Sequence, residues 1–394
     1  MLGMPRARLG GISAGVLAAC VVFASGASAK PRVVVQRAAP DDPIAVMTHQ
    51  GGGAVVVGWD MPKITTAAYR QNGTLLWRRV RDQDCGICHG DIRPLRQPDG
   101  TFGPMGFTGI TTWAYTRTGA DAPVCVGLML GDGSCISGES EPDPAALGQR
   151  RQVIVRRGQG QVIWNTPVPG VQMGRGTWNV PPRVVRDREG VAYLTFGGLK
   201  DAVTGEQIND RMYAVGVGDG VIRGMYDTGD TVKDDFVPVE PLAGLGSGAV
   251  VRAANGGLRA VNPDGSVRWA QASKGGRFPN RAVFDARLRR VVYEVPGGLR
   301  QQVVAVRASD GVVLWRTPIA ARARLLAVAP NGVVYVGATA GRLRGVWALN
   351  PKGARMWRLA VPGEPIVGAM TLRGRLAVAT TVKYRARLLY IAPR

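Results

Sequence analysis

The sequence predicts an all-β fold of short antiparallel strands, and three observations predict it. A short pattern that ends in tryptophan recurs along the chain, and a glycine occupies the same place in every copy. Glycine is also abundant overall, with 55 residues among 394. Frequent glycine suits many tight turns between short strands. The expected fold is therefore built from repeated β-hairpins.

The clearest copies of the pattern are residues 260–269 and 348–357, which read AVNPDGSVRW and ALNPKGARMW. The other copies, of which the last two have lost or displaced the tryptophan, are residues 68–77, 155–164, 305–315, 214–224 and 110–119. The apolar run before each glycine predicts one strand, and the residues up to the tryptophan predict the next. The glycine permits the positive φ that a hairpin turn requires. We expect each tryptophan to pack between neighbouring repeats.

The spacing of the turn glycines gives the period of the repeat. These glycines are Gly73, Gly119, Gly160, Gly220, Gly265, Gly311 and Gly353, so successive differences are 46, 41, 60, 45, 46 and 42 residues. A period of about 40–50 residues with four short strands in each unit is typical of the blades of a β-propeller.

The C-terminal segment predicts one more blade. Strands are expected at residues 365–372, 375–382 and 387–391, but no fourth strand follows them. Residues 32–36 can supply it, and a strand from the opposite end of the chain removes the free edges of an open sheet. The sequence thus predicts eight four-stranded antiparallel blades closed by an N-terminal strand. Seven blades are the alternative, if residues 110–126 form no blade of their own.

The pattern Ala-x-Asn/Asp-x-x-Gly-x-x-x-Trp resembles the PQQ-like repeat of quinoprotein dehydrogenases and of the lipoprotein of the Bam complex. The resemblance covers nearly all of residues 30–394 and implies a β-propeller. Quinoprotein enzymes hold PQQ with a vicinal cysteine disulfide, and the sequence contains no Cys-Cys pair. The resemblance therefore extends to the repeat and not to the cofactor site. Such propellers serve catalysis, assembly and adhesion, so the fold alone does not specify a function.

Residues 1–29 predict a cleavable signal peptide. Arg6 and Arg8 precede an apolar run at residues 9–23, and small residues at 27–29 provide a cleavage site. The run is short and interrupted by glycines, which disfavours a membrane span. The alternative is lipid attachment at Cys20, which follows Leu-Ala-Ala. We expect a secreted or envelope protein whose residues 30–394 form one propeller domain.

Positive charge is concentrated in the second half of the chain. The whole sequence has 50 Lys+Arg and 28 Asp+Glu. Residues 251–394 contain 25 basic and 5 acidic residues, a net charge of 25 − 5 = +20, whereas residues 30–250 contain 23 of each. This asymmetry indicates an anionic partner for one side of the molecule.

Arg-x-Arg pairs recur within this basic half. Residues i and i+2 of a strand point the same way, so each pair presents two guanidinium groups together. In a propeller the second-to-third turns and the connections between blades lie on one face. We expect an anion-binding face made by Arg322, Arg324, Arg342, Arg344, Arg385 and Arg387. The expected partner is an anionic envelope polymer or a protein, because single-stranded nucleic acid would require aromatic residues among these arginines.

Residues 85–89 read Cys-Gly-Ile-Cys-His, the attachment sequence of c-type haem. Cys85, Cys88 and His89 would then hold the haem. The motif occupies a short connection between two repeats, however, and not a helical cytochrome domain. Because signal cleavage leaves an even number of cysteines, disulfides are the favoured interpretation for Cys85, Cys88, Cys125 and Cys135. A turn at 132–133 favours bridges from Cys85 or Cys88 to Cys125 or Cys135 without fixing the connectivity.

The sequence predicts no catalytic residue and no metal site. Its only histidines are His49 and His89, and neither adjoins a nucleophile elbow. The acidic cluster of Asp227, Asp230, Asp234 and Asp235 does not match a calcium-binding loop, so a solvated loop is expected. The predicted function is a non-catalytic binding or scaffold propeller of the cell envelope. The alternatives are an electron-transfer protein that uses residues 85–89 and an assembly-type lipoprotein anchored through Cys20.

Overall fold

The computed structural model describes most of the chain after residue 30. The described residues are 31–40, 43–48, 53–60, 63–82, 93–96, 102–105, 114–115, 119, 121–122, 127–130, 132–145, 150–159, 161–173, 183–195, 199–201, 207–208, 211–227, 239–253, 257–272, 281–295, 301–319, 322–339, 344–382 and 385–392. Within these residues every regular element is a β-strand, as the sequence predicts. In this part of the chain, no helix is present that could act as a membrane span.

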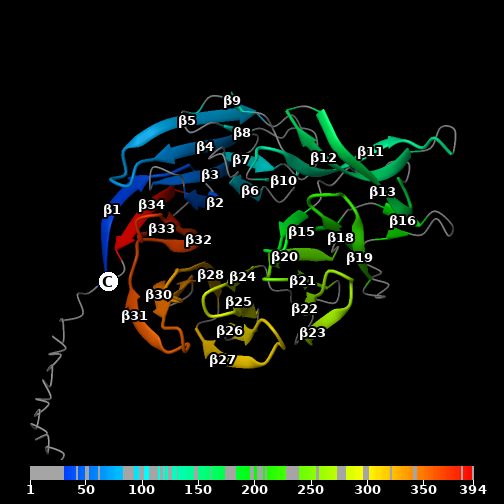
Figure 1. The fold of residues 1–394 in the computed structure, drawn as a ribbon. Helices are drawn as coiled ribbons and strands as arrows, with labels where there is room; N and C mark the ends of the chain where they lie inside the picture. Colours follow the sequence, from blue (N-terminus) through cyan, green and yellow to red (C-terminus); the bar gives the residue numbers. More distant parts are fainter. Residues whose placement is uncertain are drawn as a thin grey trace, which may run out of the picture. The chain divides into compact units, whose positions relative to one another are not determined.

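The described strands form seven antiparallel sheets of four strands and one sheet of six (Figure 1). In the first half, the strands are β2 (Pro43–Thr48), β3 (Ala54–Asp60), β4 (Lys63–Tyr69), β5 (Leu75–Asp82), β6 (Arg93–Arg96), β7 (Phe102–Met105), β8 (Ala114–Tyr115), β9 (Asp121–Ala122), β10 (Leu128–Met129), β11 (Cys135–Pro142), β12 (Arg150–Gly158), β13 (Gln161–Met173), β14 (Arg183–Arg186), β15 (Val191–Thr195), β16 (Leu199–Asp201), β17 (Gln207–Ile208), β18 (Arg211–Gly216) and β19 (Ile222–Asp227). The four strands from β2 to β5 form one sheet, and the four from β6 to β9 form another, each in chain order. A third sheet consists of β14, β15, β18 and β19, also in chain order.

The second half repeats this arrangement with shorter connections. Its strands are β20 (Glu240–Gly244), β21 (Ala249–Arg252), β22 (Leu258–Val261), β23 (Val267–Gln271), β24 (Ala282–Asp285), β25 (Arg290–Val295), β26 (Gln302–Arg307), β27 (Val313–Pro318), β28 (Ala323–Val328), β29 (Val334–Ala338), β30 (Gly345–Leu349), β31 (Arg355–Leu359), β32 (Glu364–Met370), β33 (Leu376–Val382) and β34 (Arg385–Ala392). β20–β23, β24–β27 and β28–β31 form three consecutive sheets. Their second strands are almost continuously apolar and buried, because sheets cover them on both faces.

The last sheet combines both ends of the propeller domain. Its order is β1-β34-β33-β32, where β1 (Arg32–Ala38) is the N-terminal strand. β1 pairs antiparallel with β34, and Arg32 lies opposite Ala392. The pairing predicted for residues 32–36 is therefore present. The Tyr69 hydroxyl donates to the Ala38 carbonyl at 3.0 Å and connects this sheet to the sheet of β2–β5. The number of blades and the closure of the propeller as a whole stay predictions.

One sheet departs from the predicted four strands. Its order is β10-β11-β12-β13-β16-β17, and its two extra strands come from an insertion between β15 and β18 of the following sheet. β16 pairs with the end of the long β13, where Val171 lies opposite Asp201, and β17 pairs with β16. The expectation of four strands in every blade is therefore wrong for this sheet. The insertion also explains why the interval between Gly160 and Gly220 is the longest.

At four repeats the turn glycine packs on the tryptophan of the preceding sheet. A Cβ atom on Gly311 would lie 2.8 Å from the Trp269 ring, and one on Gly353 would lie 2.6 Å from the Trp315 ring. The same contact joins Gly119 to Trp77 and Gly220 to Trp164. The predicted position of the tryptophans between neighbouring repeats is confirmed at these four sites.

Hydrogen bonds reinforce this contact between sheets. The Trp269 indole N–H donates to the Ala308 carbonyl at 3.0 Å, and Trp315 donates to Pro351 at 3.0 Å. Two residues after each tryptophan, a side chain donates to the carbonyl of the turn glycine itself. The Gln271–Gly311 distance is 2.8 Å and the Thr317–Gly353 distance is 2.7 Å. The buried polar groups of the turn are thereby satisfied.

We expect Gly311→Ala to destabilise the protein more than Gly374→Ala does. Both glycines have a left-handed φ, of 72° and 73°, so alanine costs similar backbone strain at each. Only Gly311 lies against a tryptophan, whereas nothing lies within 4 Å of a Cβ on Gly374. Overpacking should make the loss of unfolding free energy about 1–3 kcal/mol larger for Gly311→Ala. Urea denaturation measures both variants, and equal losses would show that the ring contact carries no stability.

Candidate functional site

Five of the six arginines predicted to bind an anion lie in the described residues, and Arg342 lies outside them. Arg322 and Arg324 are at the start of β28, and Arg344 directly precedes β30. Because Ala338 pairs with both Ala323 and Gly345, these three arginines share one end of their sheet. Arg385 and Arg387 lie at the start of β34 in the next sheet. The start of β32 lies at the same end of that sheet.

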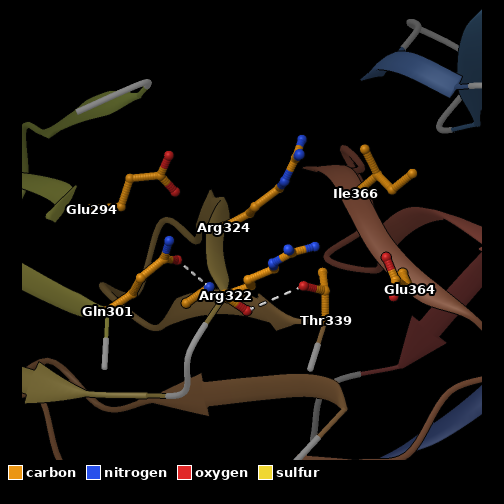
Figure 2. A pocket seen from close by; sticks show the side chains of 8 residues that line it. Glu294, Gln301, Arg322, Arg324, Thr339, Glu364 and Ile366 are labelled. Carbon is orange, nitrogen blue, oxygen red and sulfur yellow. Dashed lines mark hydrogen bonds between the residues drawn. The ribbon is translucent and has the colours of Figure 1, made fainter. Parts of the chain in front are cut away.

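A cavity of about 320 Å³ lies at these strand ends (Figure 2). Three consecutive sheets supply its walls. The lining residues are Glu294, Gln301, Arg322, Ala323, Arg324, Thr339, Glu364 and Ile366. Of the predicted arginines, the structure thus brings Arg322 and Arg324 into one cavity. Arg344, Arg385 and Arg387 are not part of its lining.

The backbone that carries the two arginines is fixed by the preceding sheet. β28 is an edge strand, so alternate N–H groups have no partner within its own sheet. The Ala323 N–H donates to Oε1 of Gln301, and the Leu325 N–H donates to the Glu294 carboxylate at 2.7 Å. Arg281 donates to the Leu325 carbonyl at 3.1 Å. Side chains of one sheet therefore hold the edge strand of the next.

Alternation along β28 separates its buried and exposed side chains. Ala323 and Leu325 are buried, whereas Arg322 and Arg324 are exposed. The Arg322 carbonyl accepts from the Thr339 N–H at 3.0 Å, which fixes the main chain at this residue. Among the residues that the structure describes, neither guanidinium group has a hydrogen-bond or ion-pair partner. The two groups are thus held side by side on a fixed strand and are available to a ligand.

Glu294 is a buried carboxylate beside these arginines, with 7 % of its surface exposed. Burial raises its pKa, while the Leu325 N–H and the charges of Arg324 and Arg281 oppose that shift. Burial also shifts the pKa of Arg281, in this case downward, and the negative charge of Glu294 opposes that shift. The sequence analysis missed Glu294, although an acid within the apolar run VVYEV is a recognisable signal. It also missed Gln301 and Glu364, which no local pattern distinguishes.

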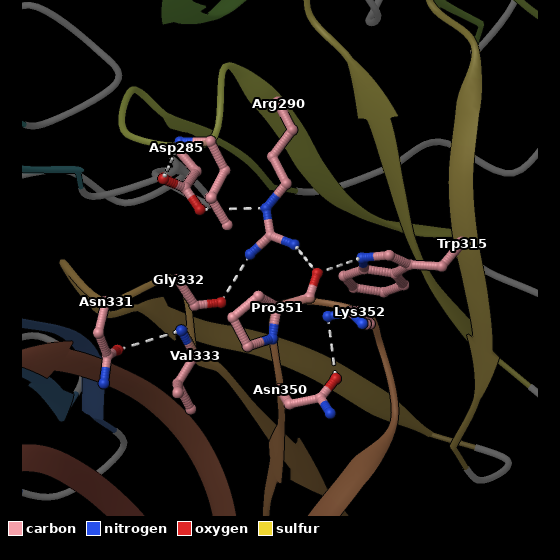
Figure 3. A network of polar contacts seen from close by, with 10 residues as sticks. Asp285, Arg290, Trp315, Asn331, Gly332, Val333, Asn350, Pro351 and Lys352 are labelled. Carbon is pink, nitrogen blue, oxygen red and sulfur yellow. Dashed lines mark hydrogen bonds and ion pairs between the residues drawn. The ribbon is translucent and has the colours of Figure 1, made fainter. Parts of the chain in front are cut away.

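Arg290 shows that other arginines of the basic half are structural (Figure 3). It is fully buried and pairs with Asp285, whose Oδ2 lies 3.0 Å from the Arg290 Nε. The guanidinium also donates to the carbonyls of Gly332, at 2.6 Å, and of Pro351. Its central carbon lies 5.6 Å from the centroid of the Trp315 ring, within range of a cation–π interaction. This group joins two sheets and is unavailable to a partner.

The other predicted sites fall mostly outside the described residues. Cys135, at the start of β11, is disulfide-bonded. Cys85, Cys88, His89 and Cys125 lie outside, so the disulfide connectivity and the haem alternative stay predictions. The same holds for the signal peptide and for lipid attachment at Cys20.

The acidic cluster is only partly described. Asp227 pairs with Arg211 at 2.9 Å, and Asp230, Asp234 and Asp235 lie outside the described residues. Across the described ranges, His, Cys, Asp and Glu form no group of three that could hold a metal ion.

Fold and site together define an all-β propeller with an arginine-lined cavity at its strand ends. Residues 254–387, which include the whole cavity, match the family model described as outer membrane protein assembly factor BamB. This match is limited to residues 254–387, and within them it agrees with the PQQ-like repeat expected from the sequence. A comparison with curated protein sequences finds no match.

Solved structures agree with this fold at low sequence identity. Sqt1 from Saccharomyces cerevisiae has a TM-score of 0.61 and 10% identity, with 93% of this chain and 100% of that chain covered. The computationally designed Ika8 protein has a TM-score of 0.56 and 13% identity, with 91% and 99% covered. A europium-containing methanol dehydrogenase has a TM-score of 0.56 and 12% identity, with 91% and 93% covered. These likenesses show the fold alone.

We expect Arg290→Met and Arg324→Met to differ strongly in stability. Removing Arg290 leaves the Asp285 carboxylate buried without its cation, which costs about 3–5 kcal/mol of unfolding free energy. Arg324 is exposed and has no hydrogen-bond or ion-pair partner among the described residues. Its replacement should therefore change the free energy of unfolding by less than about 0.5 kcal/mol. Denaturant unfolding of the two variants measures both values. A loss of similar size in Arg324→Met would show that this arginine is structural.

The raised pKa of Glu294 predicts how stability depends on pH. Because the pKa of Glu294 is higher in the folded protein than its ordinary value, the folded protein binds the carboxyl proton more tightly than the unfolded chain does. The stability that results is fully present below the ordinary pKa and is lost as pH rises through the pKa of the folded protein. Glu294→Gln keeps an oxygen that accepts from Leu325 and cannot ionise. We expect the stability of this variant relative to wild type to increase between about pH 4 and about pH 7. Urea unfolding at both pH values measures the change, with the exposed Glu189→Gln as control; a constant difference for Glu294→Gln contradicts the expectation.

Proposed function

We propose that this protein is an exported, non-catalytic binding or scaffold propeller of the cell envelope that engages an anionic partner through its arginine-lined face. The observation that supports this proposal most directly is the placement of Arg322 and Arg324. Both guanidinium groups are exposed, line one cavity and extend from a strand whose backbone is fixed by Gln301 and Glu294. A ligand would find them already in position, which lowers the entropic cost of binding.

The chemistry of these residues supports an anion as the ligand. A guanidinium group forms two parallel hydrogen bonds with a carboxylate or phosphate, which an ammonium group cannot do. The net charge of residues 251–394 adds long-range attraction that would accelerate association with a polyanion. Arg344, Arg385 and Arg387 lie at the same strand ends and extend the basic surface beyond the cavity.

The matched family supports a role in binding. Its description names an outer membrane protein assembly factor, which is a protein of the cell envelope that acts on other proteins. The predicted signal peptide at residues 1–29 supports export, and attachment through Cys20 is the alternative route to an envelope location. We therefore expect the partner to be an anionic envelope polymer or an envelope protein that presents carboxylates.

We expect the protein to bind poly-L-glutamate, and the binding to depend on salt and on the arginine-lined face. The variant changes Arg322, Arg324, Arg385 and Arg387 to Gln. The charge-matched control changes Arg287, Arg289, Arg373 and Arg375, which lie at turns on the opposite ends of the sheets. Binding by wild type should weaken strongly between about 0.02 M and about 0.5 M salt, because exposed charges are screened.

Isothermal titration at low salt compares the proteins. The four-arginine variant should lose about 10-fold or more in affinity, whereas the control should stay within about 3-fold of wild type. Circular dichroism checks that both variants are folded. Equal affinities of the variant and the control would mean that only net charge matters and that this face is no binding site.

A further inference from the structure

The cavity presents unpaired charges of both signs. Arg322 and Arg324 enter it from β28, and Glu364 enters it from the start of β32 (Figure 2). Glu364 is exposed, and among the described residues its carboxylate has no hydrogen-bond or ion-pair partner. The arginines and Glu364 line one cavity without pairing with each other. Opposite charges kept apart in this way can each bind a different group of one ligand.

The uncharged lining adds donors and a small apolar surface. Oε1 of Gln301 already accepts from the Ala323 N–H, so the amide Nε2 keeps its two N–H donors for another group. The Thr339 hydroxyl lies 3.4 Å from the Arg322 carbonyl and has lone pairs left to accept. Ile366 supplies an aliphatic wall. These groups suit the amide and methylene parts of a peptide.

A cavity of about 320 Å³ is at the small end of the range for ligand sites. It accommodates one amino acid or a few small residues, not a folded segment. A second anionic group in this space would lie beside Glu364 and be repelled. Inside the cavity, the lining therefore favours a ligand with one negative and one positive end.

We propose that this cavity binds a zwitterion, either an α-amino acid or a short peptide with a free ammonium and a free carboxylate group. Arg322 and Arg324 hold the carboxylate, and Glu364 holds the ammonium group; in a peptide ligand, the Gln301 amide can also donate to a backbone carbonyl. The inference rests on the proposed role of the two arginines as ligand-binding residues. It goes further because it assigns Glu364 as the residue that distinguishes a zwitterion from a simple anion.

The probes are glycine, diglycine and triglycine, whose charges lie progressively further apart. N-acetylated and C-amidated forms of each remove one charge while keeping the rest of the molecule. Titration followed by calorimetry or NMR should show binding of at least one zwitterion. Either modification should weaken that binding about 10-fold or more, which is the effect of losing one charged contact.

Glu364→Gln tests the assignment of the ammonium group. It should weaken binding of the zwitterion about 10-fold and leave binding of the N-acetylated probe unchanged. Glu189→Gln removes another exposed carboxylate, which lies outside the cavity, and should leave both affinities unchanged. Arg324→Gln should weaken the zwitterion and the N-acetylated probe alike, because both carry the carboxylate.

The inference is overturned if none of the three zwitterions binds, or if N-acetylation does not weaken binding. It also fails if Glu364→Gln weakens the zwitterion and its N-acetylated form equally. The comparison of probes uses the wild-type protein, so it decides the question even if a variant does not fold. Should poly-L-glutamate still bind through the arginines while no zwitterion binds, the proposed function stands and only this inference fails.

Discussion

The packing of a tryptophan ring on the glycine turn of the next sheet is the contact on which the rest of the structure depends. Gly311 and Gly353 leave no Cβ between the turn and the ring, so the sheets approach closely. The indole N–H and a second side chain then satisfy the turn carbonyls, as Trp269 and Gln271 do. Present at four sites along the chain, this contact fixes how one sheet lies against the next at each of them.

Close packing of sheets also determines the geometry of the candidate site. The edge strand β28 has N–H groups without a partner in its own sheet, and these need acceptors from elsewhere. At β28 the Gln301 and Glu294 side chains accept these N–H groups, and Arg281 donates to a carbonyl on the same edge. The interaction that stabilises the edge strand therefore also holds Arg322 and Arg324 in place. The stability of the sheet contact and the proposed binding site therefore depend on the same strand end.

The basic half of the chain contains arginines with different roles. Arg290 is buried among carbonyls, a carboxylate and an aromatic ring, and its charge serves the contact between two sheets. Arg322 and Arg324 are exposed and have no described partner, so their charge is available to a ligand. Net charge alone overstates the basic surface, because it counts both kinds equally. Burial and hydrogen bonding separate them.

The sequence by itself determined the repeat, because the turn glycines and the alternating apolar residues act through neighbours in the chain. It also indicated that residues 32–36 complete the last sheet, since the C-terminal segment lacks a fourth strand, and β1 does pair with β34. It did not indicate the six-stranded sheet, because β16 pairs with β13 of another repeat and β17 then pairs with β16. Only the tertiary structure brought Glu294, Gln301 and Glu364 around the arginines. Together with the arginines, these residues come from three sheets. Which side chains meet depends on how whole sheets pack, a long-range property that no local pattern encodes.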